Sequence, residues 1–168
     1  MNFKQRLNKV STFVFDVDGV ISEEKVYFID DKPVKSFNLK DGYAIQLAIK
    51  KGYRICIISG SRSEALKERL SKLGVQHLFF SQHDKEICYD NFILENKLSH
   101  EEVLYMGDDL PDWHVMRKVG VPVCPKDAAP EIKEISIFVS RKKGGDGCVR
   151  DIVEQVMKCQ QKWEITGW

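Results

Sequence analysis

The chain has 168 residues, of which 43% are hydrophobic and 30% charged, and its formal net charge at pH 7 is +1. This length suits a single globular domain spanning residues 1–168 and leaves no room for a second catalytic domain. The near-neutral balance gives no electrostatic reason to expect nucleic acid or an anionic membrane as a partner. Neither a signal peptide nor an apolar run of membrane-spanning length is recognisable, so we expect a cytoplasmic protein.

The first predicted strand is the short apolar run Phe13 to Phe15, which continues as Asp16-Val17-Asp18-Gly19-Val20. A run rich in Val and Phe is typical of a strand buried on both faces of a parallel sheet. In open α/β sheets, ligands bind at the carboxyl ends of the strands, where these two aspartates lie. The run therefore predicts a functional site here, and the alternative is a solvated turn or cap.

A β-hairpin is predicted within residues 23–39, with strands at 26–29 and 34–39 around a polar turn at 30–33. The first of these strands carries apolar side chains on both faces. Such a hairpin should not leave both faces in water. We therefore expect it either to pack inward or to contact another subunit.

The rest of the chain alternates between predicted strands and helices. Strands are expected at residues 54–58, 78–80, 103–106, 121–124 and 137–139. Helices are expected at residues 43–49, 61–73, 84–95, 113–118 and 129–135, and a glycine-rich tail with a terminal helix is expected over 140–168. A capping box of Ser61 with Glu64 marks the start of the helix at 61–73. A second capping signature, Ser99 with Glu102, precedes the strand at 103–106. The alternation predicts an α/β fold with a doubly wound, mostly parallel sheet sandwiched by helices.

The five cysteines and four histidines suggest no metal or redox motif. The cysteines are odd in number, widely spaced and mostly placed in apolar runs, which favours reduced thiols in the core. The histidines share no motif, and each is interpreted as structural.

Several polar side chains that could bind a ligand or react follow the predicted strands or begin the next helix. They are Asp16, Asp18, Ser59, Lys85, Asp108 and Asp109. In a parallel sheet these positions converge on one edge. Clustered aspartates need a cation, and oxygen ligands suit Mg²⁺ better than zinc. A metal, a lysine and a hydroxyl beside a helix N-terminus form a phosphate site. Taken alone, Ser59 could be a helix cap and Lys85 a surface lysine, so only their shared location carries the interpretation.

The spacing resembles the haloacid dehalogenase superfamily of phosphotransferases. The motifs are D-x-D-G-V at 16–20, Ser-Gly at 59–60, Lys85, and G-D-D-x-x-D at 107–112. Residues 37–43, 107–113 and 143–150 extend the resemblance over nearly the whole chain to the capless sugar-acid phosphatases of that superfamily. Only the hairpin separates Gly19 from the first predicted helix, so no cap domain is expected.

The resemblance implies roles for the clustered residues. Asp16 would attack phosphorus to form an aspartyl phosphate, with Asp18 as general acid and then general base. Mg²⁺ would be held by Asp16, the backbone carbonyl of Asp18, and Asp108. The remaining implied roles are binding of the phosphoryl oxygens by Ser59 and Lys85, and orientation of Lys85 or of water by Asp109 or Asp112.

The resemblance also implies a phosphorylated 2-keto-3-deoxy sugar acid as substrate. The first expectation is 3-deoxy-D-manno-octulosonate (KDO) 8-phosphate, in lipopolysaccharide precursor synthesis, and the alternative is a nonulosonate 9-phosphate. Two departures from the family pattern, Ser61 and Gln46 in place of basic residues, concern the identity of the sugar acid. The residues expected to contact the sugar acid are Asn38, Lys40, Asp41, Gly42, Arg62, Arg69 and Lys85. In a homotetramer, several of them would reach it from a neighbouring subunit.

Two structural alternatives and two other protein classes stay open at this point. Arg69 could be a solvated helix residue, and the basic segment 141–147, a candidate for closing the site, could be a solvated charge run. A response-regulator receiver domain also gathers aspartates and a lysine at strand ends, but it is shorter and its phosphoaccepting aspartate follows a later strand. An inactive oligomerisation module of the same fold is the other class.

Overall fold

The computed structural model describes residues 2–164, so residues 1 and 165–168 of the expected domain lie outside the described residues. A six-stranded sheet forms the centre, with strand order β5-β4-β1-β6-β7-β8 and every neighbouring pair parallel. Its strands are β1 (Thr12–Phe15), β4 (Arg54–Ile58), β5 (His77–Phe79), β6 (Val103–Met106), β7 (Val121–Cys124) and β8 (Phe138–Val139).

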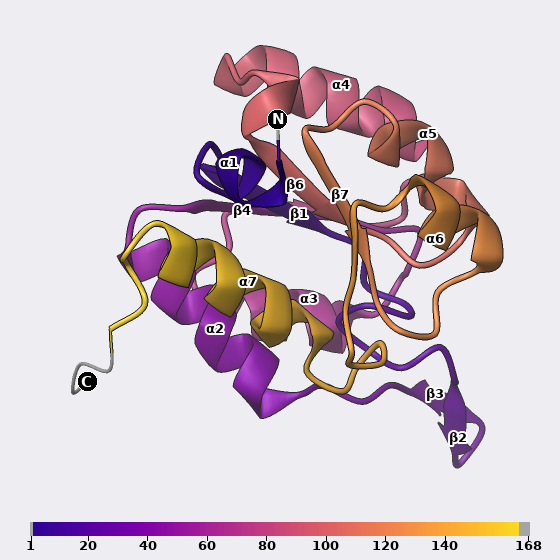
Figure 1. Ribbon diagram of the computed structural model, residues 1–168. Coiled ribbons are helices and arrows are strands. Elements are labelled where there is room, and N and C mark those ends of the chain that lie inside the picture. The colour runs from indigo at the N-terminus through magenta and orange to yellow at the C-terminus, as the bar shows by residue number, and fades with distance from the viewer. Residues whose placement is uncertain (1, 165–168) are drawn as a thin grey trace.

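Helices cover both faces of this sheet (Figure 1). On one face lie α2 (Leu39–Lys50), α3 (Glu64–Lys72) and α7 (Cys148–Cys159), together with the short α1 (Phe3–Leu7). On the other lie α4 (Lys85–Asn96), α5 (Trp113–Met116) and α6 (Pro130–Ile135), and the 3-10 helices are η1 (His100–Glu102) and η2 (Leu110–Asp112). The predicted doubly wound α/β sandwich is confirmed. Within residues 2–164, no helix is both long and apolar enough to cross a membrane.

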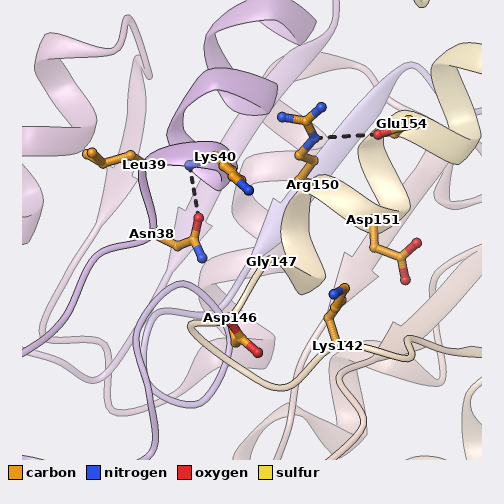
Figure 2. Close-up of a pocket in the computed structure, with 9 residues that line it drawn as sticks. All are labelled: Asn38, Leu39, Lys40, Lys142, Asp146, Gly147, Arg150, Asp151 and Glu154. Carbon is orange, nitrogen blue, oxygen red and sulfur yellow. Dashed lines mark hydrogen bonds and ion pairs between the residues drawn. The ribbon is translucent and has the colours of Figure 1, made fainter.

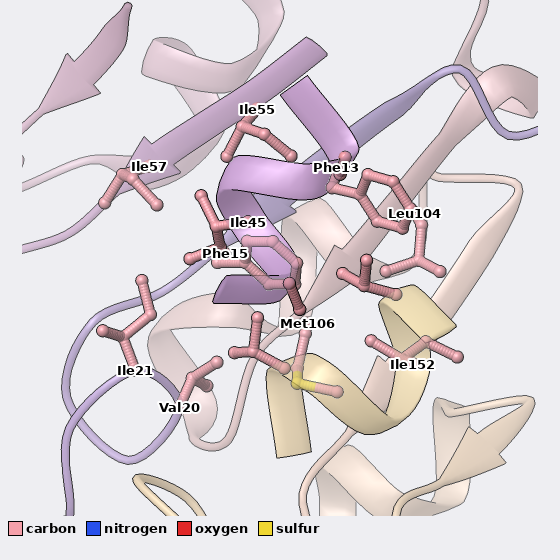
Figure 3. Close-up of a cluster of buried hydrophobic side chains, with 14 of the residues drawn as sticks. Phe13, Phe15, Val20, Ile21, Ile45, Ile55, Ile57, Leu104, Met106 and Ile152 are labelled. Carbon is pink, nitrogen blue, oxygen red and sulfur yellow. The ribbon is translucent and has the colours of Figure 1, made fainter. Parts of the chain in front are cut away.

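Strand β1 is the rigid centre of the molecule. Phe13 and Phe15 point into the cluster formed with α2 and α7 (Figure 3), whereas Val14 points into the cluster on the α4 side. All three are fully buried, and burying a Phe side chain stabilises a fold by roughly 1.5–3 kcal/mol. The backbone N–H of Asp16, the next residue, donates to the carbonyl of Met106 on β6 at 3.1 Å. Asp16 is therefore held by the core on which the strand rests.

The predicted hairpin is present and projects away from the sheet (Figure 1). Strands β2 (Tyr27–Ile29) and β3 (Lys32–Val34) pair antiparallel around Asp30 and Asp31, whose φ angles are 49° and 60°. Positive φ at both central residues is typical of a type I′ turn, whose twist suits a hairpin. Phe28 is 71% exposed, so the hairpin does not pack inward onto its own chain.

Three local expectations were wrong in detail. The second hairpin strand ends at Val34 rather than residue 39, and α2 begins at Leu39 because the Asn38 side chain caps it. Helix α3 is capped by Ser63, not Ser61, since the Ser63 side chain accepts from the N–H of Leu66. Helix α1 was not predicted. The capping box of Ser99 with Glu102 is confirmed, although it opens a 3-10 turn.

The cysteines agree with the expectation of reduced thiols. All five are free, and four of them are buried: Cys56, Cys88, Cys124 and Cys148.

Candidate active site

A cavity of about 650 Å³ opens where β1, β4 and β6 end. All seven residues expected to carry the chemistry line it: Asp16, Asp18, Ser59, Lys85, Asp108, Asp109 and Asp112. They come from four separate segments of the chain, so it is the parallel sheet that brings them together. A depression of about 790 Å³ elsewhere on the molecule is larger. The smaller cavity is nevertheless the better candidate because it holds the clustered carboxylates and the buried lysine.

Lys85 bridges two carboxylates at the floor of the cavity. Its Nζ lies 2.8 Å from Asp16 Oδ2 and 2.7 Å from Asp112 Oδ1, and all three side chains are at least nine-tenths buried. Burial alone would lower the pKa of Lys85, but the charges of Asp112 and Asp16 outweigh it and raise that pKa. Lys85 therefore stays a cation, positioned by both partners.

Backbone and tyrosine donors fix the two carboxylates further. The N–H of Val17 donates to Asp16 Oδ1 at 2.6 Å. Asp112 accepts from the hydroxyl of the fully buried Tyr105 at 2.7 Å and from the N–H of Asp108 at 3.1 Å. The network joins β1, the first turn of α4, and the segment that follows β6. These bonds hold the side chains of Asp16, Lys85 and Asp112 in place at the cavity.

Two glycines allow this close approach. At Gly19 φ is +77°, and a Cβ there would lie 1.9 Å from Asp108 Oδ2. At Gly107 a Cβ would lie 2.4 Å from the Cβ of Asp112. Any larger residue at either place would push an aspartate out of the cluster.

The carboxylates of Asp16, Asp108 and Asp112 can hold a divalent cation. One oxygen from each lies within 4.8 Å of the others, and all three residues are buried. Burial, and then the charge of Asp112, raises the pKa of Asp16 to about 7. Burial, and then the charge of Asp16, raises the pKa of Asp108 to about 8. In both cases burial is the larger cause and the neighbouring carboxylates the second, and oxygen ligands of this kind suit a hard cation such as Mg²⁺.

The metal cluster differs in one member from the expected ligand set of Asp16, Asp18 and Asp108. The third carboxylate of the cluster is Asp112, whereas the resemblance assigns only the backbone carbonyl of Asp18 to the metal. The Asp18 side chain is 45% exposed, and its Oδ1 accepts from the Lys35 ammonium and, at 3.3 Å, from the Ser22 hydroxyl. Its carboxyl group is thus free of the metal cluster and faces the cavity, where proton transfer is needed.

Ser59 is 1% exposed and directly follows β4 at the cavity wall. Its Oγ accepts from the N–H of Ser61 at 3.1 Å, which leaves its own O–H available as a donor. Binding of a phosphoryl oxygen by this hydroxyl stays a prediction.

Apart from Lys85, the expected substrate contacts fall outside this cavity. Asn38 and Lys40 line the depression of about 790 Å³ between the first turns of α2 and α7, together with Arg150 (Figure 2). Arg62 and Arg69 are exposed and line neither hollow. The Arg69 guanidinium lies 5.4 Å from the centre of the Phe37 ring. Apart from Lys85, which belongs to both sets, the single chain therefore does not bring the substrate set together with the chemical set.

Asp41 and Gly42 are both buried. Oδ1 of Asp41 accepts from the N–H of Arg150 at 2.7 Å, at the start of α7, and Oδ2 has no hydrogen-bond partner among the residues that the structure describes. Burial raises the pKa of Asp41 to about 6. Asp41 thus joins α2 to α7 with no surface open to a ligand, and its contact with substrate stays a prediction.

The glycine-rich segment supports the catalytic loop from its own chain. A Cβ at Gly144 would lie 1.9 Å from the carbonyl oxygen of Gly19, and the N–H of Gly145 donates to the carbonyl of Val20 at 2.9 Å. None of residues 141–147 lines the cavity. Within one chain the segment therefore supports residues 19–20, and the expectation that it closes an active site stays a prediction.

Sequence reasoning missed several residues of the site, among them His83, Tyr105 and Lys35. His83 lines the cavity, although it was interpreted as structural, and Tyr105 and Lys35 contact Asp112 and Asp18. His83 lies two residues before Lys85, so that short spacing was a usable signal. Tyr105 and Lys35 gave none, because their contacts arise only from the tertiary fold.

Comparisons with known proteins identify the family to which the chain belongs. No protein-family model matches it. It is 37% identical over 161 residues to the 3-deoxy-D-manno-octulosonate 8-phosphate phosphatase of Yersinia pestis. The aligned region covers 95% of this chain and 86% of the relative. The crystal structure of the Yersinia pestis enzyme aligns with a TM-score of 0.91 at 36% identity, covering 95% of this chain and 86% of that one.

Two further solved structures contain metals. The phosphatase of the same name from Moraxella catarrhalis, in complex with magnesium, phosphate and KDO, aligns with a TM-score of 0.90 at 27% identity, covering 94% of this chain and 91% of that one. A cobalt-bound enzyme from Haemophilus influenzae aligns with a TM-score of 0.89 at 25% identity, covering 94% and 93%. The chain belongs to the 3-deoxy-D-manno-octulosonate 8-phosphate phosphatase family, the capless phosphoric monoester hydrolases of the haloacid dehalogenase superfamily.

Proposed function

We propose that this protein is a Mg²⁺-dependent phosphatase that converts KDO 8-phosphate into KDO and inorganic phosphate, as a single catalytic domain. One observation carries the proposal: Asp16, Asp18, Ser59, Lys85 and Asp108 surround one cavity in a chain that belongs to this family. Hydrolysis of a phosphate monoester is very slow in water, so a site must supply a nucleophile, a proton donor and charge compensation. These five residues supply all three.

Asp16 and Asp108 would hold Mg²⁺, with the backbone carbonyl of Asp18 as the ligand implied by the family. When bound, the ion offsets negative charge on the carboxylates and on the transferring phosphoryl group. Asp112 shares the cluster and would orient Lys85, to which it is already bonded at 2.7 Å. Asp109 lines the same cavity and would orient water at the metal.

In the first half of the reaction, a carboxylate oxygen of Asp16 forms a bond to phosphorus as the bond from phosphorus to the sugar oxygen breaks. Asp18, in its protonated form, gives its proton to that leaving oxygen. The products of this half are the free sugar acid and an aspartyl phosphate at Asp16.

In the second half, a water oxygen forms a bond to phosphorus while Asp18 accepts a proton from that water. The bond between phosphorus and the Asp16 oxygen breaks, which restores the Asp16 carboxylate and releases phosphate. Asp18 ends the cycle protonated, ready to serve again as an acid. Lys85 and the Ser59 hydroxyl would bind the remaining phosphoryl oxygens through both halves.

Substrate choice would need a second subunit. The hairpin exposes Tyr27, Phe28 and Ile29 at 50%, 71% and 60%, a patch that another copy would cover. We propose a homotetramer in which Asn38, Lys40 and the arginines Arg62 and Arg69 reach a neighbouring cavity. Within one chain none of these four residues lines the cavity that holds the chemical set, which supports this arrangement. A monomer by light scattering at micromolar concentration would contradict it.

The decisive experiment is a phosphate-release assay over a substrate panel in the presence of Mg²⁺. The panel contains KDO 8-phosphate, a nonulosonate 9-phosphate, simple sugar phosphates and 4-nitrophenyl phosphate. We expect the highest kcat/KM for KDO 8-phosphate. A preference for the nonulosonate ester would reassign the substrate, and a lack of turnover on every ester would overturn the enzyme assignment in favour of an inactive module.

A further inference from the structure

Lys35 links the hairpin to the catalytic cavity. It follows β3 directly, and its ammonium contacts Oδ1 of Asp18 and, at 3.0 Å, the hydroxyl of Ser61. Its side chain is only 14% exposed, whereas Val34, the residue before it, is 40% exposed. A lysine drawn inward from an otherwise exposed hairpin, with both a carboxylate and a hydroxyl as partners, is held in one place.

The contact is directional at Asp18. Within residues 2–164, both side-chain hydrogen bonds to this carboxylate fall on Oδ1, one from Lys35 and one from Ser22 at 3.3 Å. That arrangement fixes the plane of the carboxyl group and leaves Oδ2 for a reacting atom. Proton transfer depends on such placement, because an error of about 1 Å can cost roughly 100-fold in rate.

We propose that Lys35 is a positioning residue for Asp18, through which the hairpin is connected to proton transfer in the reaction. The inference rests on the proposed function, in which Asp18 protonates the leaving oxygen. Because Lys35 is joined by one peptide bond to the end of β3, any contact that sets the orientation of the hairpin also sets the position of this ammonium. Assembly through the hairpin would then support catalysis without supplying a catalytic group.

Leaving groups of different quality separate this role from others. A sugar alkoxide is a poor leaving group and needs a proton from Asp18, whereas 4-nitrophenolate leaves readily without one. For a phosphatase with a covalent intermediate, kcat/KM reports only the steps up to formation of that intermediate. The comparison of the two esters therefore tests the acid role of Asp18 and excludes its later role as a base.

The test is Lys35→Met, assayed on KDO 8-phosphate and on 4-nitrophenyl phosphate. We expect kcat/KM for the sugar ester to fall roughly 10- to 100-fold, mainly through kcat, as for loss of a charge-assisted hydrogen bond. The aryl ester should change by less than about threefold. Lys35→Arg, which keeps the charge, should recover much of the lost rate. Lys35→Gln serves as a second variant if the Met variant is poorly folded.

Lys32→Met is the matched control, because Lys32 lies on β3, the strand that Lys35 directly follows, and is exposed. It should behave as the wild-type protein on both esters, and melting temperature and light scattering should be unchanged for both variants. Equal losses on the two esters, a change confined to KM, or wild-type rates for Lys35→Met would overturn the inference. Failure of the proposed substrate is distinguishable, because the wild-type protein would then cleave another alkyl phosphate but not KDO 8-phosphate, and Lys35 would be tested on that ester.

Discussion

The cavity at the strand ends and the depression between α2 and α7 differ in how they are built. The cavity at the strand ends is lined by buried groups that bond to one another, such as Lys85 with Asp16 and Asp112. The depression between α2 and α7 is lined by exposed side chains, including Lys40 and Leu39. The sheet of one chain builds the cavity, whereas the depression is lined by side chains that a ligand or a second subunit can reach. Chemistry and substrate choice are therefore expected to respond differently to mutation.

The largest effect is expected at the nucleophile. Asp16→Asn removes a charge with little change in volume, so turnover should fall by at least about 10³-fold while the fold is retained. Phosphate release and circular dichroism check both parts. Asp31→Asn is the matched control, since Asp31 is an exposed turn residue at φ 60°, a conformation that asparagine tolerates. Release of phosphate at the wild-type rate by Asp16→Asn would contradict the assignment.

Removal of metal should be nearly as severe and should depend on pH. The pKa values of Asp16 and Asp108 rise from 3.8 to about 7 and about 8. Because both are raised, the metal-free protein has its full stability from these groups below about pH 4 and loses it as the pH rises through 7 to 8. A bound cation stabilises the ionised forms and reverses this loss.

The measurement is thermal unfolding with EDTA and with Mg²⁺ at pH 5 and pH 8, alongside activity. We expect EDTA to abolish turnover and Mg²⁺ to restore it. The increase in melting temperature on adding Mg²⁺ should be larger at pH 8 than at pH 5. An increase that is equal at both pH values, or larger at pH 5, would show that these carboxylates do not hold the ion.

Intermediate effects are expected from the substrate set. Arg69→Ala and Lys40→Ala should each raise the barrier for the sugar acid ester by roughly 1.5–3 kcal/mol, the scale of a lost charged hydrogen bond. Hydrolysis of 4-nitrophenyl phosphate should hardly change. Lys72→Ala, on the same helix as Arg69, is the control. If both substrates lost activity equally, these residues would belong to the fold or the phosphoryl site instead.

The smallest effect is expected from the hydroxyl behind the cavity. Tyr105→Phe removes the donor to Asp112 but leaves Lys85 bonded to it, so stability should fall by about 1–2 kcal/mol and kcat/KM by less than about tenfold. Tyr89→Phe is a suitable comparison, because Tyr89 is also buried and bonds to His100, outside the cavity. A matching loss of activity in both variants would point to a general effect of packing.

Much of the fold could be predicted because the alternation of apolar runs follows directly from burial in a parallel sheet. The strands at residues 103–106 and 121–124, for example, have the predicted bounds. The misplaced cap of α3 shows the limit: Ser61 and Ser63 are both good caps, and the choice depends on the distant ammonium that occupies the Ser61 hydroxyl. Helix α1 is only five residues long and carries too little periodicity to be recognised.

The chemical set was predictable for a similar reason. Residues such as Asp16, Ser59 and Asp108 lie within two residues of a strand end, so their meeting point depends on the order of the sheet. Lys35 could not be found in this way, because its contact with Asp18 depends on the path of the chain after the hairpin. The burial of Asp41 likewise follows from the packing of α2 on α7, which no local pattern reports.

The contact of Gly144 with Gly19 has a consequence for biosynthesis. A ribosome makes Gly144 more than a hundred residues after the catalytic loop, and α7, which covers one face of the sheet, comes later still. Contacts at such sequence separation close late in folding. A growing chain that already carries Asp16 and Asp108 would still lack the backing of its loop. Phosphatase activity is therefore expected to begin only after α7 has left the exit tunnel, so nascent chains should be catalytically silent.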